Sequence, residues 1–202
     1  MIKDLFNKLF GNKSDSKDST NNNHQKVIGP QVEPPTVPVY EGTPGIRYLI
    51  TKESPKQILS EDFPGQEWPI SGSWGYTPED AVVIELDDDW EGVEFEYKFL
   101  KYRTYEEAVI FRPKEQRLAG FQFESKMQSL HNGQNGRHYD EIIMSVSAYL
   151  SSDYEYLKND WESHNAYEGD EVGKANHLQL AETKKIRYEI VGHFDITQFF
   201  GK

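Results

Sequence analysis

Two of the chain's six histidines flank a Gly-rich segment, an arrangement that could bring two metal ligands together. His131 and His138 lie on either side of residues 132–136, Asn-Gly-Gln-Asn-Gly. If the chain folds back here so that paired residue numbers sum to 269, the two imidazoles face each other and could share a metal ion. The alternative is two polar residues beside an exposed turn. A zinc site needs at least three protein ligands. The candidates for the third are Asp140, Glu141 and His193.

His193 also lies two residues before Asp195. Residues two apart on a strand share a face, so this carboxylate could orient the imidazole for acid–base work. No nucleophile lies nearby in the sequence, and the alternative is a strand end beside solvent. His131, His138 and His193 together define one functional hypothesis, a metal-binding protein or a hydrolase.

Two acidic clusters are further candidate sites, Glu106-Glu107 and residues 87–89. Paired carboxylates do acid–base chemistry when burial separates their pKa values, whereas adjacent acids in a turn are usually solvated. The Asp run lacks the spaced ligands and central Gly of an EF-hand. The sequence also contains no phosphate-binding Gly-Lys loop, dinucleotide-binding Gly motif, nucleophile elbow or zinc-protease helix motif. We therefore predict no cofactor and favour a protein without catalysis.

An aromatic, Gly-rich loop at residues 68–76 is the more promising surface. Aromatic side chains on such a loop are binding hot spots when they are exposed, and core residues when they are buried. Acidic residues follow shortly after it and would complement a basic protein. The predicted partner-binding residues are Trp68, Trp74, Tyr76, Asp87, Asp88, Asp89 and Trp90.

The charge of the chain points the same way. The net charge is -12, and residues 1–36 carry five Lys against four acids. The remainder carries 17 Lys and Arg against 30 Asp and Glu, a net of -13. Such a surface repels nucleic acid and anionic lipid and attracts basic partners, so we expect no nucleic acid partner. The alternative is that the charge serves solubility.

The absence of cysteine excludes disulfides and Cys-based zinc sites, and it is typical of a reducing cytoplasm. No apolar run reaches 18 residues, so no membrane-spanning helix is predicted. Residues 1–10 lack the long apolar core and cleavage site of a signal peptide. These features predict a cytoplasmic protein.

Three regions follow from the composition. Residues 1–11 form an amphipathic head, which is too short for a stable free helix and needs a surface: its own domain, a second copy or a membrane. Residues 12–38, rich in Ser, Asn and Pro, are a predicted disordered linker. Residues 39–202 are a single acidic domain. The apolar residues with helical spacing in the head are Ile2, Leu5, Phe6, Leu9 and Phe10.

The domain itself is predicted to be α+β, with a mainly antiparallel twisted sheet of six or seven strands and two to four short helices. Helices are expected from Pro55 to before Pro64 and over residues 152–164, where Ser-x-x-Glu gives a capping box. A single turn is expected at residues 77–80, a second capping box at 104–107, and a long loop at 164–182. The predicted strands are residues 45–52, 81–86, 93–100, 108–111, the two arms of the hairpin within 121–150, and 184–194.

The hairpin within residues 121–150 fixes the predicted core. With the register that sums to 269, Phe123 faces Val146 and Met127 faces Ile142, so both apolar sets lie on one side of the sheet. The members of these sets are Phe121, Phe123 and Met127 on one strand, and Ile142, Met144, Val146 and Ala148 on the other.

Taken together, these observations predict a non-enzymatic, cytoplasmic protein-binding or accessory protein of a bacterial type. A narrower hypothesis is an immunity-type protein that neutralises a basic toxin, because an acidic inhibitor of a basic enzyme associates rapidly.

Overall fold

The computed structural model describes residues 54–86, 89–133, 136–198 and 200–201. The head, the linker and the strand predicted at residues 45–52 lie outside this part of the chain. The described residues form one five-stranded sheet in the order β1-β2-β5-β4-β3, in which β2 and β5 are parallel and all other neighbours antiparallel. The strands are β1 (Ile70–Gly72), β2 (Val82–Ile84), β3 (Leu118–Asn132), β4 (His138–Leu150) and β5 (Ile186–Asp195).

Four α-helices complete the described fold, and the α+β class is confirmed. The prediction of six or seven mainly antiparallel strands is wrong in detail, because the described sheet has five strands and is mixed. The main cause is that two predicted strands belong to one long helix. The helices are α3 (Pro55–Asp62), α4 (Asp89–Tyr105), α5 (Ser151–Ser163) and α6 (Glu171–Lys184).

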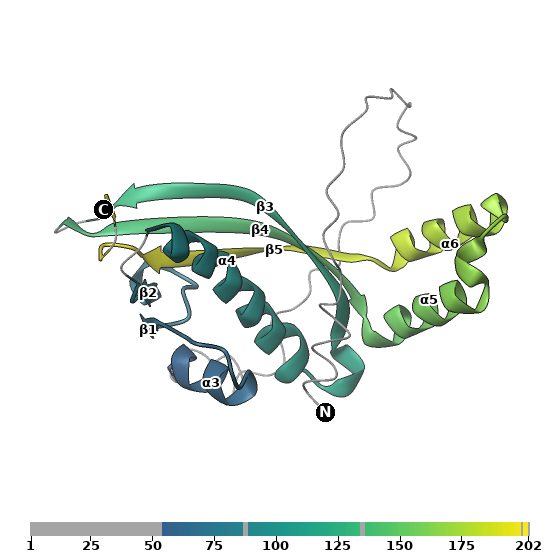
Figure 1. Ribbon diagram of the computed structural model, residues 1–202, viewed down its shortest axis with the longest axis horizontal. Coiled ribbons are helices and arrows are strands. Elements are labelled where there is room, and N and C mark those ends of the chain that lie inside the picture. The colour runs from purple at the N-terminus through teal and green to yellow at the C-terminus, as the bar shows by residue number, and fades with distance from the viewer. Residues whose placement is uncertain (1–53, 87–88, 134–135, 199, 202) are drawn as a thin grey trace, which may run out of the picture.

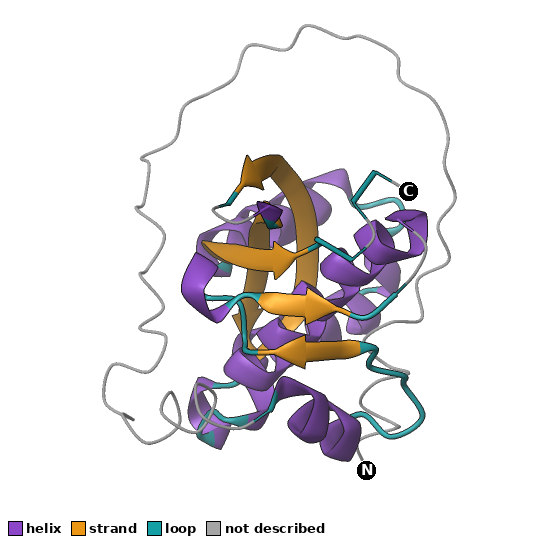
Figure 2. Ribbon diagram, turned by 90° about the vertical axis from the view of Figure 1, so that its left-hand side faces the viewer, coloured by secondary structure: helices purple, strands orange, loops and turns teal. Residues whose placement is uncertain are grey.

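The core lies between the sheet and α4, which runs along one face of the strands with α3 beside it (Figure 1). Phe99 of α4 packs edge-on against Phe194 of β5, with ring centroids 5.9 Å apart, and tilts against Trp74 at 6.2 Å. No described α-helix covers the other face of β3, β4 and β5 in Figure 1, and Figure 2 shows how strongly the sheet curves.

The hairpin of β3 and β4 confirms the predicted register at its centre and loses it toward the turn. Phe123 pairs with Val146 as predicted, but Met127 pairs with Ile143 because a bulge inserts Lys126. A one-residue insertion moves every later side chain of the strand to the other face. Met127 is therefore 44% exposed instead of buried. The apolar set of β4 is buried as predicted: Ile142, Met144, Val146 and Ala148.

The strand predicted at residues 93–100 is wrong, because this stretch lies inside α4. The buried face of the helix combines Phe95 and Phe99 with the charged residues Glu96 and Arg103, which follow helical spacing. The apolar residues alone alternate, and this alternation imitates a strand. The predicted capping box at 104–107 is also wrong, since the Thr104 hydroxyl donates to the Leu100 carbonyl within the helix.

The strand predicted at residues 108–111 is instead a π-helical turn, Glu106–Ile110, that continues α4. The Phe111 amide donates to the Glu106 carbonyl, five residues earlier, at 3.0 Å. Both charged residues at the start of this turn, Glu106 and Glu107, are buried. π-helical turns inside α-helices are often found at functional sites.

The shorter predictions around the sheet are confirmed. Helix α3 starts at Pro55 and ends at Asp62, and Pro78–Asp80 form a single 3₁₀ turn with a capping box from Thr77. β2 follows this turn directly.

The last third of the domain departs most from the prediction. Helix α5 is confirmed, but the predicted capping box is wrong, because the helix begins at Ser151 after Leu150, whose side chain cannot cap it. Most of the predicted loop at 164–182 is helix α6, capped by Asp170, whose carboxylate accepts from the Gly173 amide at 2.8 Å. α6 buries only His177, so its sequence lacks the apolar stripe that identifies a helix. α5 and α6 form a helical hairpin that extends beyond the end of the sheet (Figure 1).

Candidate functional site

The predicted pair of metal ligands at the hairpin turn is not brought together. The bulge in β3 changes the register by one, so that His131 pairs with Tyr139 and Asn132 pairs with His138. Successive residues point to opposite faces, and the two imidazoles are therefore on opposite faces of the sheet. Nδ1 of His138 is hydrogen-bonded to the side-chain amide oxygen, Oδ1, of Asn132 at 2.9 Å. Across the described ranges, no group of three or more His, Cys, Asp or Glu residues could hold a metal ion.

His193 of β5 has a carboxylate neighbour, but a different one from that predicted. Its Nδ1 lies 3.7 Å from Glu141 Oε2 on the adjacent strand, where these two residues are paired in register. Burial lowers the pKa of His193, and the nearby Glu141 opposes that effect. Asp195 is occupied elsewhere, because its Oδ1 accepts bonds from the backbone amide and hydroxyl of Thr197 at 3.1 and 2.6 Å.

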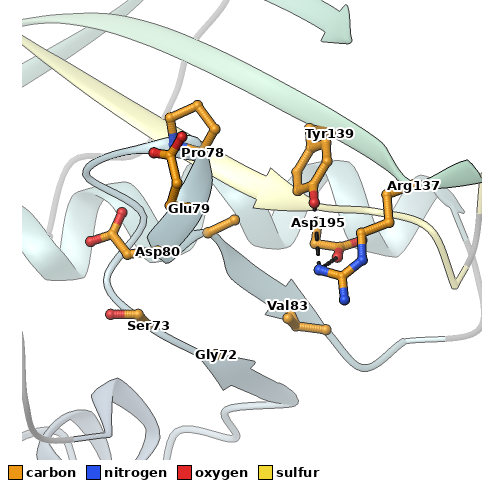
Figure 3. A pocket seen from close by; sticks show the side chains of 10 residues that line it. Gly72, Ser73, Pro78, Glu79, Asp80, Val83, Arg137, Tyr139 and Asp195 are labelled. Carbon is orange, nitrogen blue, oxygen red and sulfur yellow. Dashed lines mark hydrogen bonds and ion pairs between the residues drawn. The ribbon is translucent and has the colours of Figure 1, made fainter. Parts of the chain in front are cut away.

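A pocket of about 230 Å³ opens beside Asp195, between the β1–β2 connection and the start of β4 (Figure 3). Arg137 reaches across it, with Nη1 3.5 Å from both the Asp195 carboxylate and the Tyr139 hydroxyl. Ser73 supplies a hydroxyl, but no histidine lines the pocket, so a Ser–His pair is not formed there. The pocket is lined by Gly72, Ser73, Pro78, Glu79, Asp80, Ala81, Val83, Arg137, Tyr139 and Asp195.

The predicted partner-binding aromatic residues are largely part of the core. Trp68 is 4% exposed and Trp74 is fully buried. Tyr76 is half-buried, and its hydroxyl donates to Glu107 Oε1 at 2.6 Å. Of the acidic part, Asp87 and Asp88 lie outside the described residues, and Asp89 and Trp90 begin α4 with side chains that are not described. Trp68 and Trp74 are therefore core residues and not exposed binding residues.

A buried arginine of α4 ties three parts of the fold together. Arg103 donates to the backbone carbonyls of Trp74 at 2.8 Å and Val191 at 2.6 Å, and its Nε lies 3.3 Å from Glu107 Oε1. The guanidinium also lies over the Tyr76 ring, 4.5 Å from its centroid. These contacts satisfy the charge within the core and give it a structural purpose.

Two further carboxyls on the same helical segment, those of Glu96 and Glu106, are buried. Neither carboxyl makes a hydrogen bond of normal geometry to a described residue, although the carboxyl of Asp62 faces that of Glu106. Burial raises the pKa of each to about 9, with smaller contributions from Asp140 beside Glu96 and from Asp62 beside Glu106. Glu106 is therefore buried, whereas the sequence predicts a solvated side chain. Neither residue lines the pocket or the groove described here.

A second concave surface lies on the helical hairpin. A groove of about 340 Å³, which we name the α5–α6 groove, runs between the two helices next to the end of β4. Aromatic rings make up much of its wall, and Leu178 on its rim is 54% exposed. The groove is lined by Tyr149, Tyr154, Leu157, Lys158, Trp161, His177, Leu178 and Ala181.

A hydrogen-bonded cluster fixes the two helices on either side of this groove. The Asp160 carboxylate accepts from the Tyr167 hydroxyl at 2.8 Å and lies 2.6 Å from Nδ1 of His177. These bonds lower the pKa of Asp160, and the bond to Asp160 raises the pKa of Tyr167 to about 12. The rings of Trp161 and His177 lie 5.1 Å apart. The groove is therefore held open by a fixed scaffold.

The turn between the helices has an unusual backbone. Asn165, Ala166 and Tyr167 have φ values of 50, 57 and 56°, three successive non-glycine residues in the left-handed region. Each such residue costs on the order of 1 kcal/mol and persists only when its surroundings enforce it. The bond from Tyr167 to Asp160 is one such constraint.

The hairpin is also strongly acidic. Residues 151–184 contain eight Asp and Glu and three Lys, a net of -5. Of the six large apolar side chains that are exposed among the described residues, three lie on this hairpin, namely Tyr156, Val172 and Leu178. Sequence reasoning missed this surface because residues 164–182 were read as a loop. The signal that was present is the helical spacing of His177, Leu178 and Ala181 opposite Leu157 and Trp161.

Comparison of the chain with protein-family models, with curated proteins and with solved structures finds no match. Within the described part of the chain, no helix has the length and apolar character needed to cross a membrane.

Proposed function

We propose that this chain is a protein-binding protein without catalysis, and that its α5–α6 hairpin receives a basic partner. The observation that carries the proposal is the aromatic α5–α6 groove, about 340 Å³, on an arm with a net charge of -5. The partner places an apolar or aromatic side chain in the groove, while its positive charges face the acidic residues around it. This combination of a buried anchor and a charged rim is typical of protein interfaces.

The dimensions support an anchor side chain rather than a larger molecule. Ligand pockets commonly hold about 300–1,000 Å³, and this groove is at the small end of that range. The exposed Leu178 and Tyr156, at 54% and 55%, add apolar surface on the same arm. The acidic charge would accelerate association with a basic protein and make it sensitive to salt.

The narrower hypothesis, neutralisation of a basic toxin in a bacterial cytoplasm, is part of this proposal and depends on identifying the partner. The hypothesis of a metal protein or hydrolase has less support, because His131 and His138 lie on opposite faces of the sheet and the described residues contain no group of three or more metal ligands.

The test compares two neighbouring surface substitutions in the intact, tagged chain. Leu178→Glu places a charge on the rim of the groove, whereas Gln179→Glu adds the same charge at an exposed position that does not line it. Proteins captured from the source lysate at low salt are identified, and their affinities for the variants are measured. We expect a basic partner whose affinity falls at least about tenfold with Leu178→Glu and little with Gln179→Glu.

Raising the salt concentration should also weaken the complex, since the charges lie at an exposed rim. Equal affinity of the two variants for every captured protein, or a complex that is insensitive to salt, would contradict the proposal.

A further inference from the structure

We infer that the α5–α6 groove is the docking site of the chain's own N-terminal head, through the apolar stretch at residues 1–10. This inference goes beyond the proposed function and does not depend on it, because it concerns a contact within one chain. It names the segment that would fill the α5–α6 groove, and it gives the apolar head the protein surface that it needs.

The head has the chemistry of a segment that binds in a groove. Ile2, Leu5, Phe6, Leu9 and Phe10 share one face at helical spacing. Ten residues are too few for a stable helix in water, so its helical form requires an apolar surface. An amphipathic helix commonly meets that requirement by laying its apolar face into a hydrophobic groove on a protein.

The α5–α6 groove offers that surface more fully than other parts of the described chain. The rings of Tyr149 and Tyr154, 6.2 Å apart, and the ring of Trp161 give it aromatic walls. Of the other exposed large apolar side chains, Tyr156 and Val172 are on the same hairpin but do not line the groove, and the remaining three lie away from it, on β3 and near the end of the described chain. These three are Met127, Leu130 and Phe200. The pocket beside Asp195 is smaller and carries charged residues on its walls.

Charge favours the same docking. The head carries Lys3 and Lys8 against Asp4, a net of +1, and faces a hairpin with a net of -5. The described sheet face beside β3 lacks this bias, because Lys126 there pairs with Glu189. The head therefore has a small excess of positive charge opposite an acidic surface. It resembles the basic, apolar partner that the hairpin is suited to receive.

The connection allows the contact within a single chain. Residues 11–53 separate the head from Ser54, the first described residue. A fully extended chain covers at most about 3.5 Å per residue, so this connection can span roughly 150 Å. A tethered segment has an effective concentration that reaches the millimolar range for short linkers, well above a micromolar second copy. Docking on the same chain is therefore favoured over exchange between copies.

The consequence is competition at the groove. A bound head occupies the surface on which the proposed partner would anchor, so the partner must displace it. The affinity of the partner would then include the cost of releasing the head.

The absence of cysteine makes a distance measurement direct. Gly11→Cys and Glu155→Cys, the latter at an exposed position on α5, are spin-labelled in the full chain, and the label separation is measured by pulsed electron resonance. We expect a narrow, short-distance population. Phe6→Glu should abolish it, whereas Asn7→Glu, on the polar face of the head, should retain it with the same added charge.

On the domain side, Leu178→Glu should remove the short-distance population and Gln179→Glu should not. Diluting the labelled chain with an excess of unlabelled chain should leave the population unchanged. A broad distribution that Phe6→Glu does not alter would overturn the inference. So would a short distance that disappears on dilution, since the head would then occupy a second copy. Because no partner is present, failure here is distinct from failure of the proposed function.

Discussion

The two buried glutamates of the α4 segment predict that this fold becomes less stable as the pH rises through neutrality. Glu96 and Glu106 have ordinary pKa values of 4.5, and burial raises both to about 9. Below 4.5 each group is protonated in the folded and the unfolded chain, so neither affects the pH dependence. Between 4.5 and 9 the unfolded chain releases the proton and the folded chain retains it. The free energy of unfolding therefore falls as the pH rises across this range.

The fall in the free energy of unfolding depends on the pH interval and on the number of groups that are protonated only in the folded state. One group that is protonated only in the folded state lowers the free energy of unfolding by about 1.4 kcal/mol per pH unit. Two such groups remove about 2.7 kcal/mol between pH 7 and pH 8. Burial lowers the pKa of His193 below its ordinary 6.5, so this side chain stays neutral across that interval.

The perturbation is Glu96→Gln, which has the size and neutrality of the protonated acid. It should halve the slope between pH 7 and 8, and the double variant with Glu106→Gln should nearly abolish it. Urea unfolding followed by tryptophan fluorescence measures the effect. With an m-value of about 2 kcal/mol/M, the wild-type midpoint should fall by about 1.4 M over that pH unit.

The matched control is Glu94→Gln, on the same helix but exposed. It should leave the wild-type slope intact. A wild-type chain whose midpoint is constant or rises between pH 7 and 8 would refute the reasoning, as would a Glu96→Gln variant that keeps the full slope. Either result would mean that these carboxyls are ionised or solvated in the folded state.

Three further perturbations test other contacts. Arg103→Met should cost about 3 kcal/mol or more in urea unfolding, because it leaves carbonyls unpaired and a buried carboxylate without its cation. Gly75→Ala, at φ +71° with a new Cβ 2.7 Å from the His193 carbonyl, should destabilise more than Gly136→Ala, at φ +74° with open space around it. Both glycine variants share the conformational cost of about 1 kcal/mol, so their difference measures the contact. Asp160→Asn should speed amide exchange in α6 several-fold and leave β4 unchanged, since it weakens the bonds to Tyr167 and His177; exchange that is unaltered would contradict this.

The parts of the fold that could be predicted are those where one physical signal acts alone. β4 alternates because one of its faces is buried against α4 and the other is not covered by a described helix, and its core residues follow from that pattern. Pro55 after Ser54 and the Thr77 capping box fix their turns locally. None of these requires knowledge of what packs against them beyond a single apolar layer.

The errors arise where charge enters the interior or where burial is too slight to leave a pattern. Glu96 and Arg103 are on the buried face of α4, so a pattern of apolar residues alone misses the helical period. The prediction misses helix α6 for a different reason, since His177 is its only buried residue and leaves no apolar pattern. The bulge at Lys126 contains no glycine from which the sequence could predict it. This one-residue insertion places His131 and His138 on opposite faces of the sheet.

The distribution of these features makes function and stability separable in this molecule. The buried charges of α4 lie in the core against the sheet, whereas the α5–α6 groove lies on an arm held by its own cluster around Asp160. Substitutions of exposed groove residues such as Leu178 leave that core untouched. A loss of binding in such a variant, at an unchanged urea midpoint, can therefore be assigned to the groove, and the pH slope of Glu96 should persist in it unaltered.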